Sequence, residues 1–256
     1  KGKRIIDHSG DFRYKSVEVY EKWYNTTHGM PHLLDISVYG LPELHREEIK
    51  TAQIVGNPGC YPTCSILGLA PLIKNRLVDT KNIIIDAASG VTGAGRNADL
   101  PYQFCECTEN FKAYKVSTHR HTSEIEQEIS LLAGEEITVS FTPHLVPMKR
   151  GMLCTIYANL ACEKDTAELI ALYKEYYKDE CFVRILDEGI LPETKNVAGS
   201  NYIDISLVVD KRLNRVIVLS AIDNLGKGAA GQAVQDLNIM FGLPENRGLT
   251  SPGLYL

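Results

Sequence analysis

One cysteine of this chain stands in a tight turn between two apolar segments. Cys60 follows Gly56-Asn57-Pro58-Gly59, with an expected buried strand over residues 52–55 and apolar residues at helical spacing over 63–73. We therefore expect Cys60 to lie close to a helix N-terminus, where backbone N–H groups and the helix dipole favour a thiolate and lower the thiol pKa from about 8.5. The pattern predicts a nucleophile; a buried structural cysteine is the alternative.

A second cluster combines two histidines with a carboxylate. His119 and His121 are two positions apart, and Glu124 falls just inside an expected helix start that Thr122 or Ser123 would cap. In an extended segment the two imidazoles would point the same way, and Glu124 would orient one of them for general acid/base work. An exposed polar cap and a two-histidine metal half-site are the alternatives.

A glycine-rich segment follows a strand expected over residues 82–87. Residues 89–95 contain Gly-x-x-Gly-x-Gly, which can present backbone N–H groups to a phosphate or let a cofactor lie against the main chain. A flexible turn would have the same composition. The spacing differs from the Gly-x-Gly-x-x-Gly that opens a dinucleotide-binding βαβ unit, so we predict no pyrophosphate site here.

Composition excludes several classes of protein. The chain has 256 residues, 44% of them apolar and 23% charged, as in soluble globular proteins of one large or two ordinary domains. A net charge of -5 without a dense basic block argues against nucleic-acid binding. There is no apolar run of about 18 residues, so we expect no membrane span. Seven scattered cysteines without a Cys-x-x-Cys pair indicate neither a disulfide framework nor a zinc site, and favour a reducing compartment.

The order of expected elements suggests two kinds of architecture. In the first part, strands over 4–7 and 52–55 alternate with a helix over 43–51, after an aromatic-rich loop over 12–24; this alternation favours a parallel sheet. The second part has expected strands over 137–141, 151–162, 203–210 and 216–221 and a surface helix over 166–178, typical of an α+β domain with a mixed sheet. A helix of small residues is expected over 227–241.

Together these segments resemble N-acetyl-gamma-glutamyl-phosphate reductase, the NADP-dependent enzyme family of arginine biosynthesis that is related to aspartate-semialdehyde dehydrogenase. The resemblance runs along almost the whole chain. The segments that carry it are residues 7–13, 38–43, 57–63 (Asn-Pro-Gly-Cys-Tyr-Pro-Thr), 89–96, 119–125 (His-Arg-His-Thr-Ser-Glu-Ile), 141–151 and 223–233. Residues 119–125 and 143–151 look like the arginine-pathway branch rather than its relatives.

The resemblance implies a two-domain plan. Residues 1–60 and 223–256 would form a Rossmann-type NADP-binding domain, and residues 61–222 an inserted substrate-binding and dimerisation domain with a mixed sheet. Family members open with about half a Rossmann domain, including its glycine-rich phosphate loop. This chain begins after that half, so the resemblance implies an incomplete Rossmann-type domain, with the missing part expected upstream.

The resemblance also implies a mechanism. The Cys60 thiolate would attack the acyl phosphate and expel phosphate, and NADPH would reduce the thioester to N-acetylglutamate 5-semialdehyde. His119 or His121 would be the acid/base with Glu124 as orienter. Arg13 would bind phosphate, and weaker candidates for the α-carboxylate are Arg120, Arg150 and Arg96. Ser89, Gly90 and Asn224 would contact the nicotinamide end of NADP. A cytoplasmic homodimer or homotetramer acting on a small molecule is implied.

Three other functions are weighed against this one. An aspartate-semialdehyde dehydrogenase would run the same chemistry on a shorter, unacetylated substrate. A Cys–His acyl hydrolase or transferase would use Cys60 and His121 without a nucleotide. A non-catalytic remnant would be consistent with the expected absence of the N-terminal half.

Overall fold

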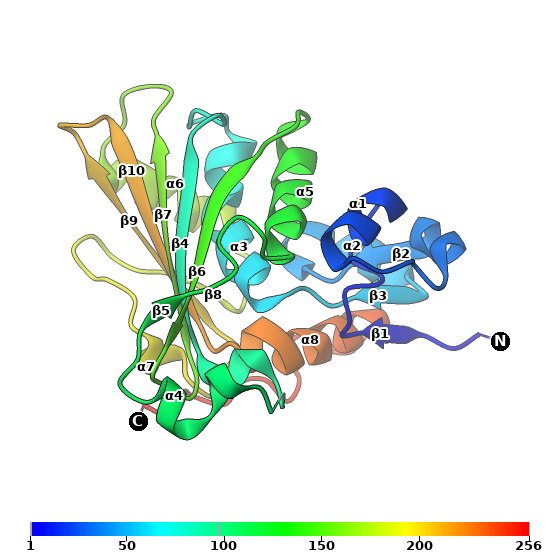
Figure 1. Ribbon diagram of the computed structural model, residues 1–256. Coiled ribbons are helices and arrows are strands. Elements are labelled where there is room, and N and C mark those ends of the chain that lie inside the picture. The colour runs from blue at the N-terminus through cyan, green and yellow to red at the C-terminus, as the bar shows by residue number, and fades with distance from the viewer. Residues whose placement is uncertain (1, 97, 256) are drawn as a thin grey trace.

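The computed structural model describes residues 2–96 and 98–255, and its strands form two sheets of different size (Figure 1). The small sheet is parallel, in the order β1-β3-β2, with β1 at Ile5–Asp7, β2 at Ser37–Tyr39 and β3 at Ile54–Gly56. The helices α1 (Val17–Tyr24) and α2 (Pro42–Thr51) belong to this part of the chain. Parallel strands joined through helices confirm the α/β architecture predicted for it.

The large sheet has seven strands in the order β5-β6-β4-β7-β10-β9-β8. The pairs β4–β6 and β8–β9 are parallel and the other pairs antiparallel, so the sheet is mixed, as predicted. Its strands are β4 (Ile83–Gly90), β5 (Lys112–Ala113), β6 (Val139–Val146), β7 (Met152–Asn159), β8 (Val183–Ile185), β9 (Ile203–Asp210) and β10 (Arg215–Ile222).

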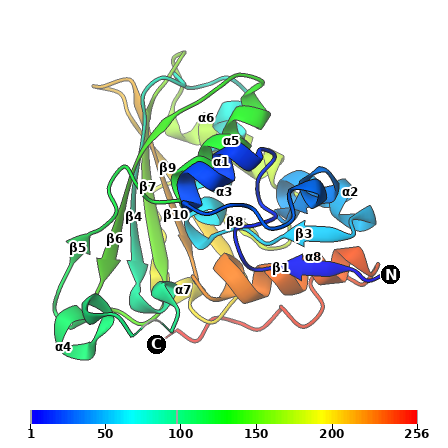
Figure 2. The ribbon, with the colours of Figure 1, turned by 45° about the vertical axis from the view of Figure 1, so that its right-hand side comes forward.

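Three helices lie on one side of the large sheet (Figure 2): α3 (Cys60–Lys74), α5 (His121–Ala133) and α6 (Thr166–Tyr176). Along β4 and β7 every second side chain is buried, and these side chains form the main core with α3 and α5. The alternation follows from the two-residue period of a strand. The short helices α4 (Phe104–Cys107) and α7 (Thr194–Val197) lie near the lower end of the sheet in Figure 1.

Helix α3 is buried on nearly all sides, with 13 of its 15 residues buried. It packs between α5 and the strands β7 and β10. Pro71 inside the helix has no N–H to give to the carbonyl of Leu67, and the hydroxyl of Tyr177 donates to that carbonyl at 2.6 Å instead. The hydroxyl of Tyr173 also donates to a carbonyl of α3, that of Gly68, at 2.6 Å. Two tyrosines thus satisfy backbone acceptors of a buried helix.

The C-terminal helix returns to the small sheet. A π-helical turn, η4 (Gly226–Ala230), leads into α8 (Gly231–Met240), which packs against α2 and β1. Lys227 is fully buried there, and its Nζ donates to Glu43 Oε1 at 2.6 Å and to Gln235 Oε1 at 2.8 Å. Because a buried ammonium needs a countercharge, this contact ties the start of the C-terminal helix to α2.

Some local expectations are wrong. The aromatic-rich segment 12–24 contains helix α1, which Ser16 caps by accepting from the Val19 N–H. Neither Thr122 nor Ser123 is a cap, because α5 already begins at His121 and both lie in its first turn. The helix expected over 227–241 starts as the π-helical turn instead. None of the described helices is long and apolar enough to cross a membrane.

Candidate active site

Cys60 is the first residue of α3, after the N-cap residue Gly59. Two glycines allow close approach to it. A Cβ atom at Gly59 would lie 2.4 Å from Nε2 of His121, and a Cβ atom at Gly228 would lie 2.8 Å from Cβ of Cys60. Residues with side chains at these positions would push apart the three segments that meet here, namely the Cys60 turn, the start of α5 and the π-helical turn.

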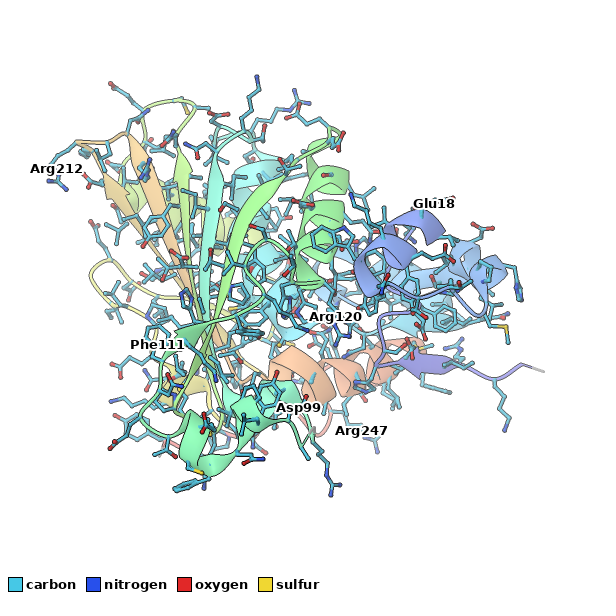
Figure 3. All side chains as sticks on the ribbon, in the orientation of Figure 1. Glu18, Asp99, Phe111, Arg120, Arg212 and Arg247 are labelled. Atoms are coloured by element: carbon cyan, nitrogen blue, oxygen red, sulfur yellow. The ribbon has the colours of Figure 1, made fainter. Side chains whose placement is uncertain are left out.

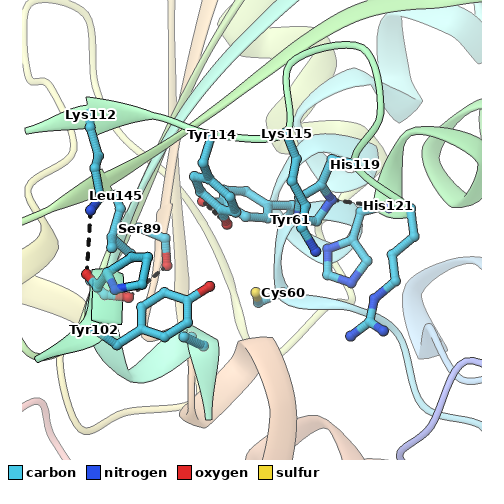
Figure 4. A pocket seen from close by; sticks show the side chains of 15 residues that line it. Cys60, Tyr61, Ser89, Tyr102, Lys112, Tyr114, Lys115, His119, His121 and Leu145 are labelled. Atoms are coloured by element: carbon cyan, nitrogen blue, oxygen red, sulfur yellow. Dashed lines mark hydrogen bonds between the residues drawn. The ribbon is translucent and has the colours of Figure 1, made fainter. Parts of the chain in front are cut away.

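Two hollows meet at the cysteine. One, of about 340 Å³, is lined by aromatic and basic side chains from β5 and the segment before α5 (Figure 4). The other, of about 540 Å³, is lined largely by backbone and small residues from the segments around residues 8–11, 57–60, 92–95 and 224–229. The residues common to both are Cys60, Gly93, Arg120 and His121. A substrate and a second reactant can therefore reach the sulfur from different directions.

The two histidines do face one site, although not from an extended segment. His119 lies in a turn and His121 opens α5, with ring centroids 4.7 Å apart. Nδ1 of His119 accepts from the backbone N–H of His121 at 3.1 Å, so its proton sits on Nε2. Among the described residues, no hydrogen-bond partner contacts the buried Nδ1 of His121. The other ring nitrogen, Nε2, faces the Cys60 turn, where a Cβ atom at Gly59 would lie 2.4 Å from it.

Both imidazoles are neutral. Burial, together with the nearby cations Lys115 and Arg120, lowers the pKa of His119 to about 3. Burial also holds the pKa of His121 well below its usual value, with His119 and Arg13 adding to the effect. Neither imidazole carries a proton at rest, so each has the lone pair that a general base needs, although the low pKa makes the ring a weak base until an anion binds nearby.

The pKa of Cys60 differs from the expectation. Burial raises the pKa of its thiol to about 12, and this outweighs the Tyr61 N–H and the Arg13 charge, which lower the pKa. The helix N-terminus is present as predicted, but desolvation destabilises the thiolate by more than the helix N-terminus stabilises it. Cys60 is therefore a thiol at rest, and a base has to remove its proton.

Glu124 does not orient an imidazole, contrary to the prediction. Its buried carboxylate accepts from the Gly59 N–H at 2.8 Å and the Tyr39 hydroxyl at 2.7 Å through Oε1, and from Arg13 Nη1 at 3.2 Å through Oε2. These partners belong to the Cys60 turn, the small sheet and the segment after β1. Glu124 therefore holds the cysteine turn in place rather than a histidine.

Arg13 lines the larger hollow but is already occupied. Besides Glu124, its guanidinium donates from Nη2 to the carbonyl of His8 at 3.1 Å, and its side chain is only 8% exposed. Burial lowers the pKa of Arg13, but the Glu124 carboxylate together with the hydroxyls of Tyr24, Tyr39 and Tyr14 outweighs this effect, so the pKa is raised. The predicted phosphate contact would have to compete with this ion pair.

The other three arginines lie in different surroundings. Arg120 lines both hollows and stacks over the ring of Tyr24, with 5.1 Å from Cζ to the centroid; Figure 3 shows it between the two parts of the molecule. Arg150 pairs with buried Asp223 at 2.8 Å and lines neither hollow. Arg96 is exposed and is also absent from both linings. Of the three, only Arg120 is in place to touch a substrate.

The residues expected at the nicotinamide end come together beside Cys60. Ser89 and Gly90 line the smaller hollow, and Asn224 lines the larger one. The Asn224 amide accepts from the Gly151 N–H at 2.8 Å and donates to the Thr92 hydroxyl at 3.0 Å, which fixes the 3₁₀ turn η2 (Val91–Ala94). The η2 turn, which follows β4 directly, is thereby held at the mouth of both hollows.

Several pocket residues were not predicted from the sequence. Tyr61, Tyr102, Lys112, Tyr114 and Lys115 line the smaller hollow (Figure 4). The hydroxyl of Tyr114 donates to that of Tyr61 at 3.1 Å, which in turn donates to the carbonyl of His144. The pattern Lys-x-Tyr-Lys at residues 112–115, shortly before the two histidines, could have indicated these pocket residues, but a solvated loop has the same composition.

Glu124→Gln tests the role assigned to that carboxylate. The amide oxygen can still accept from Gly59 and Tyr39, but its NH₂ group would face the buried guanidinium of Arg13, which loses its countercharge. We expect the free energy of unfolding, measured with urea, to fall by about 3–5 kcal/mol. Glu126→Gln on the same helix is the control, because its oxygen can still accept from the Val139 N–H. Equal effects of the two variants would contradict the role.

The pH dependence of Cys60 alkylation tests its protonation state. Because burial raises its pKa to about 12, the rate with iodoacetamide, followed by peptide mass spectrometry, should rise through pH 7–10 without a plateau. The exposed Cys162 in the same digest controls for the reagent. A plateau near pH 7 would show a thiolate at rest and contradict the assignment.

Comparison with known proteins agrees with this geometry. The family described as semialdehyde dehydrogenase, dimerisation domain, matches residues 60–224. N-acetyl-gamma-glutamyl-phosphate reductase of Acetivibrio thermocellus is 86% identical over 256 residues, which are 100% of this chain and 74% of the relative. The reductase of Desulforamulus reducens is 62% identical over 255 residues, again 100% and 74% of the two chains.

Solved structures show the same fold at low sequence identity. Aspartate semialdehyde dehydrogenase II from Vibrio cholerae has a TM-score of 0.69 at 16% identity, over 93% of this chain and 72% of that one. The aspartate semialdehyde dehydrogenase with NADP from Candida albicans has a TM-score of 0.64 at 15% identity, over 93% and 70%. From its sequence relatives, this chain belongs to the N-acetyl-gamma-glutamyl-phosphate reductase family of the semialdehyde dehydrogenases.

Proposed function

We propose that this chain carries the active site for reduction of N-acetyl-gamma-glutamyl phosphate to N-acetylglutamate 5-semialdehyde and phosphate with NADPH. The observation that carries the proposal is the position of Cys60, at a helix start where a cation-lined hollow and a glycine-lined hollow meet. The relatives with this name at 86% and 62% identity support the acetylated five-carbon substrate. The neighbours named for aspartate semialdehyde share only 16% and 15% identity and support the fold.

In the proposed mechanism the chain supplies nucleophile and base. His121 takes the thiol proton of Cys60, since its imidazole is neutral and its Nε2 faces the Cys60 turn. The sulfur attacks the acyl carbon, a C–S bond forms, and the C–O bond to phosphate breaks with its electron pair going to phosphate. A thioester on Cys60 results. When that bond later breaks, His121 returns the proton to the sulfur and the thiol is restored.

The larger hollow fits the reactive end of a nicotinamide cofactor. It borders Cys60 directly. Gly93 and Gly228 keep it open, because a Cβ atom at Gly93 would lie 3.0 Å from Ser89 Oγ and one at Gly228 would lie 2.8 Å from Cys60 Cβ. Asn224 and the η2 turn would hold the ring there, and Arg120 closes the hollow toward the histidines. NADP(H), when bound, supplies or accepts the hydride. The division into an NADP-binding part, 1–60 with 223–256, and a substrate part, 61–222, belongs to this proposal.

An NADP-linked assay tests the function. The product of the complete reading frame should reduce NADP with N-acetylglutamate semialdehyde and phosphate, and Cys60→Ser should abolish turnover without unfolding the protein. His121→Asn should cost about 100-fold or more in kcat, and His119→Asn less, because the His119 Nδ1 is occupied by a backbone N–H. Cys162→Ser is the matched control.

Three outcomes of the assay would overturn the proposal. Preference for aspartate semialdehyde would favour the related dehydrogenase, and phosphate-independent ester hydrolysis would favour the acyl hydrolase. Absence of both activities in a folded protein would favour a non-catalytic remnant. Near wild-type rates for both histidine variants would remove the imidazoles from the mechanism but leave the reductase reading in place.

A homodimer through the large sheet is part of the proposal. The face opposite α3 presents a row of apolar side chains across four paired strands, Ile84, Tyr157, Ile217 and Val208. Val208 is 39% exposed and the other three are half-buried. The matched family is named for dimerisation and covers these strands. The seven cysteines are free thiols, which suits a cytoplasmic location.

Ile217→Arg tests the proposed dimer. A cation in the middle of the apolar row cannot be buried against a second copy without a countercharge, so sedimentation should show the dimer dissociating to monomer. Leu213→Arg at the exposed hairpin between β9 and β10 is the control and should leave the mass unchanged. An unchanged mass for Ile217→Arg would place the interface elsewhere.

A further inference from the structure

One cation of the active-site pocket has no assigned role. Lys115 lines the hollow that contains Cys60, on the side of the two imidazoles, whereas Lys112 lies on the opposite side (Figure 4). The side chain of Cys60 lies below and between them in this view. A bound acyl phosphate carries negative charge at both ends, so a pocket with a cation on either side of the nucleophile matches its charge distribution.

The backbone around Lys115 is held in an uncommon conformation. Lys115 has a φ of 47° and Ser117 a φ of 57°, in the left-handed region that residues with side chains rarely adopt. The N–H of Thr118 donates to the carbonyl of Lys115 at 3.0 Å and closes this turn between β5 and α5. Left-handed residues of this kind cost free energy and concentrate at functional sites. Here they turn Lys115 toward the imidazoles.

The charge of Lys115 is not compensated. No ion pair or side-chain hydrogen bond of its ammonium is present among the described residues. The buried carboxylate nearest to the site, Glu124, already binds Arg13 and Tyr39. The field of Lys115 reaches both imidazoles, since it helps to lower the pKa of each. An unpaired cation beside a nucleophile and a neutral base is ready to bind an anion.

Arg13 is poorly placed for that task. Its two terminal nitrogens donate to Glu124 and to the His8 carbonyl, and only 8% of it is exposed. A phosphate that took Arg13 would leave Glu124 buried without its countercharge, at a cost that an exposed lysine does not incur. Among the basic residues that line the smaller hollow, Lys115 and Arg120 are the exposed ones on the histidine side.

We propose that Lys115 binds the phosphate group of the substrate, and inorganic phosphate in the reverse direction, in place of Arg13. This inference rests on the proposed function. Lys115 stays protonated throughout: its N–H groups donate to phosphate oxygens while the C–O bond breaks and the electron pair moves to the departing oxygen. The only proton transfer is the one between Cys60 and His121. Lys115 thus stabilises the charge of the leaving group and touches the substrate directly.

Lys115→Met tests the inference in the reverse reaction with the product of the complete reading frame. Loss of a charge-assisted contact should raise KM for phosphate by about 10- to 100-fold, with KM for N-acetylglutamate semialdehyde changed less than about twofold. Lys115→Arg should restore most of the phosphate affinity. Lys211→Met, between β9 and β10 and outside both hollows, is the matched control and should leave KM for both substrates unchanged. Lys115 is exposed, so its substitution does not endanger folding.

Two results would overturn the inference. If Lys115→Met raises KM for the semialdehyde and not for phosphate, Lys115 binds the α-carboxylate; if neither KM changes, it binds no substrate group. A second readout needs no turnover: inorganic phosphate should slow iodoacetamide alkylation of Cys60, and Lys115→Met should remove this protection. If the wild-type protein is inactive but phosphate still protects Cys60, the proposed function is wrong and the anion site stands. If the protein is active and phosphate gives no protection, the proposed function stands and the anion site is wrong.

Discussion

The active site depends on one buried carboxylate. Glu124 accepts hydrogen bonds from the Gly59 N–H, the Tyr39 hydroxyl and Arg13, three groups that belong to different parts of the chain. A fully buried carboxylate is stable only when all of these donors are in place. The geometry of the Cys60 turn, the position of α5 and the contact with the small sheet are therefore linked through a single side chain.

Burial and cations then set the protonation states of the site. Burial raises the pKa of Cys60 to about 12 and holds that of His121 well below its usual value. Before substrate binds, the Cys60 thiol and the His121 imidazole are both neutral, so no isolated charge is buried in the pocket. An anionic substrate adds the missing negative charge next to Lys115 and Arg120. Nucleophile activation thus coincides with substrate binding in the mechanism we propose.

Much of this site was predictable because its signals are local in the sequence. A cysteine in a Gly-Pro turn before an apolar run predicts a helix start, and Cys60 is the first residue of α3. The strand near residue 54 and the mixed sheet were also predicted correctly. The helix in the aromatic segment 12–24 was not, because α1 has only eight residues and is fixed by its Ser16 cap and by packing among Tyr14, Tyr20 and Tyr24.

The sequence alone determined the family and the place of Cys60 at a helix start, since these depend on order and spacing along the chain. Only the tertiary structure decided what each charged group does. Glu124 binds Arg13 rather than a histidine, and Arg150 binds Asp223 rather than a pocket, because a buried charge takes the countercharge that packing brings to it. Lys115 is exposed, and packing brings it no countercharge from the described residues. The Cys60 pKa rises because desolvation depends on neighbours that are distant in the sequence.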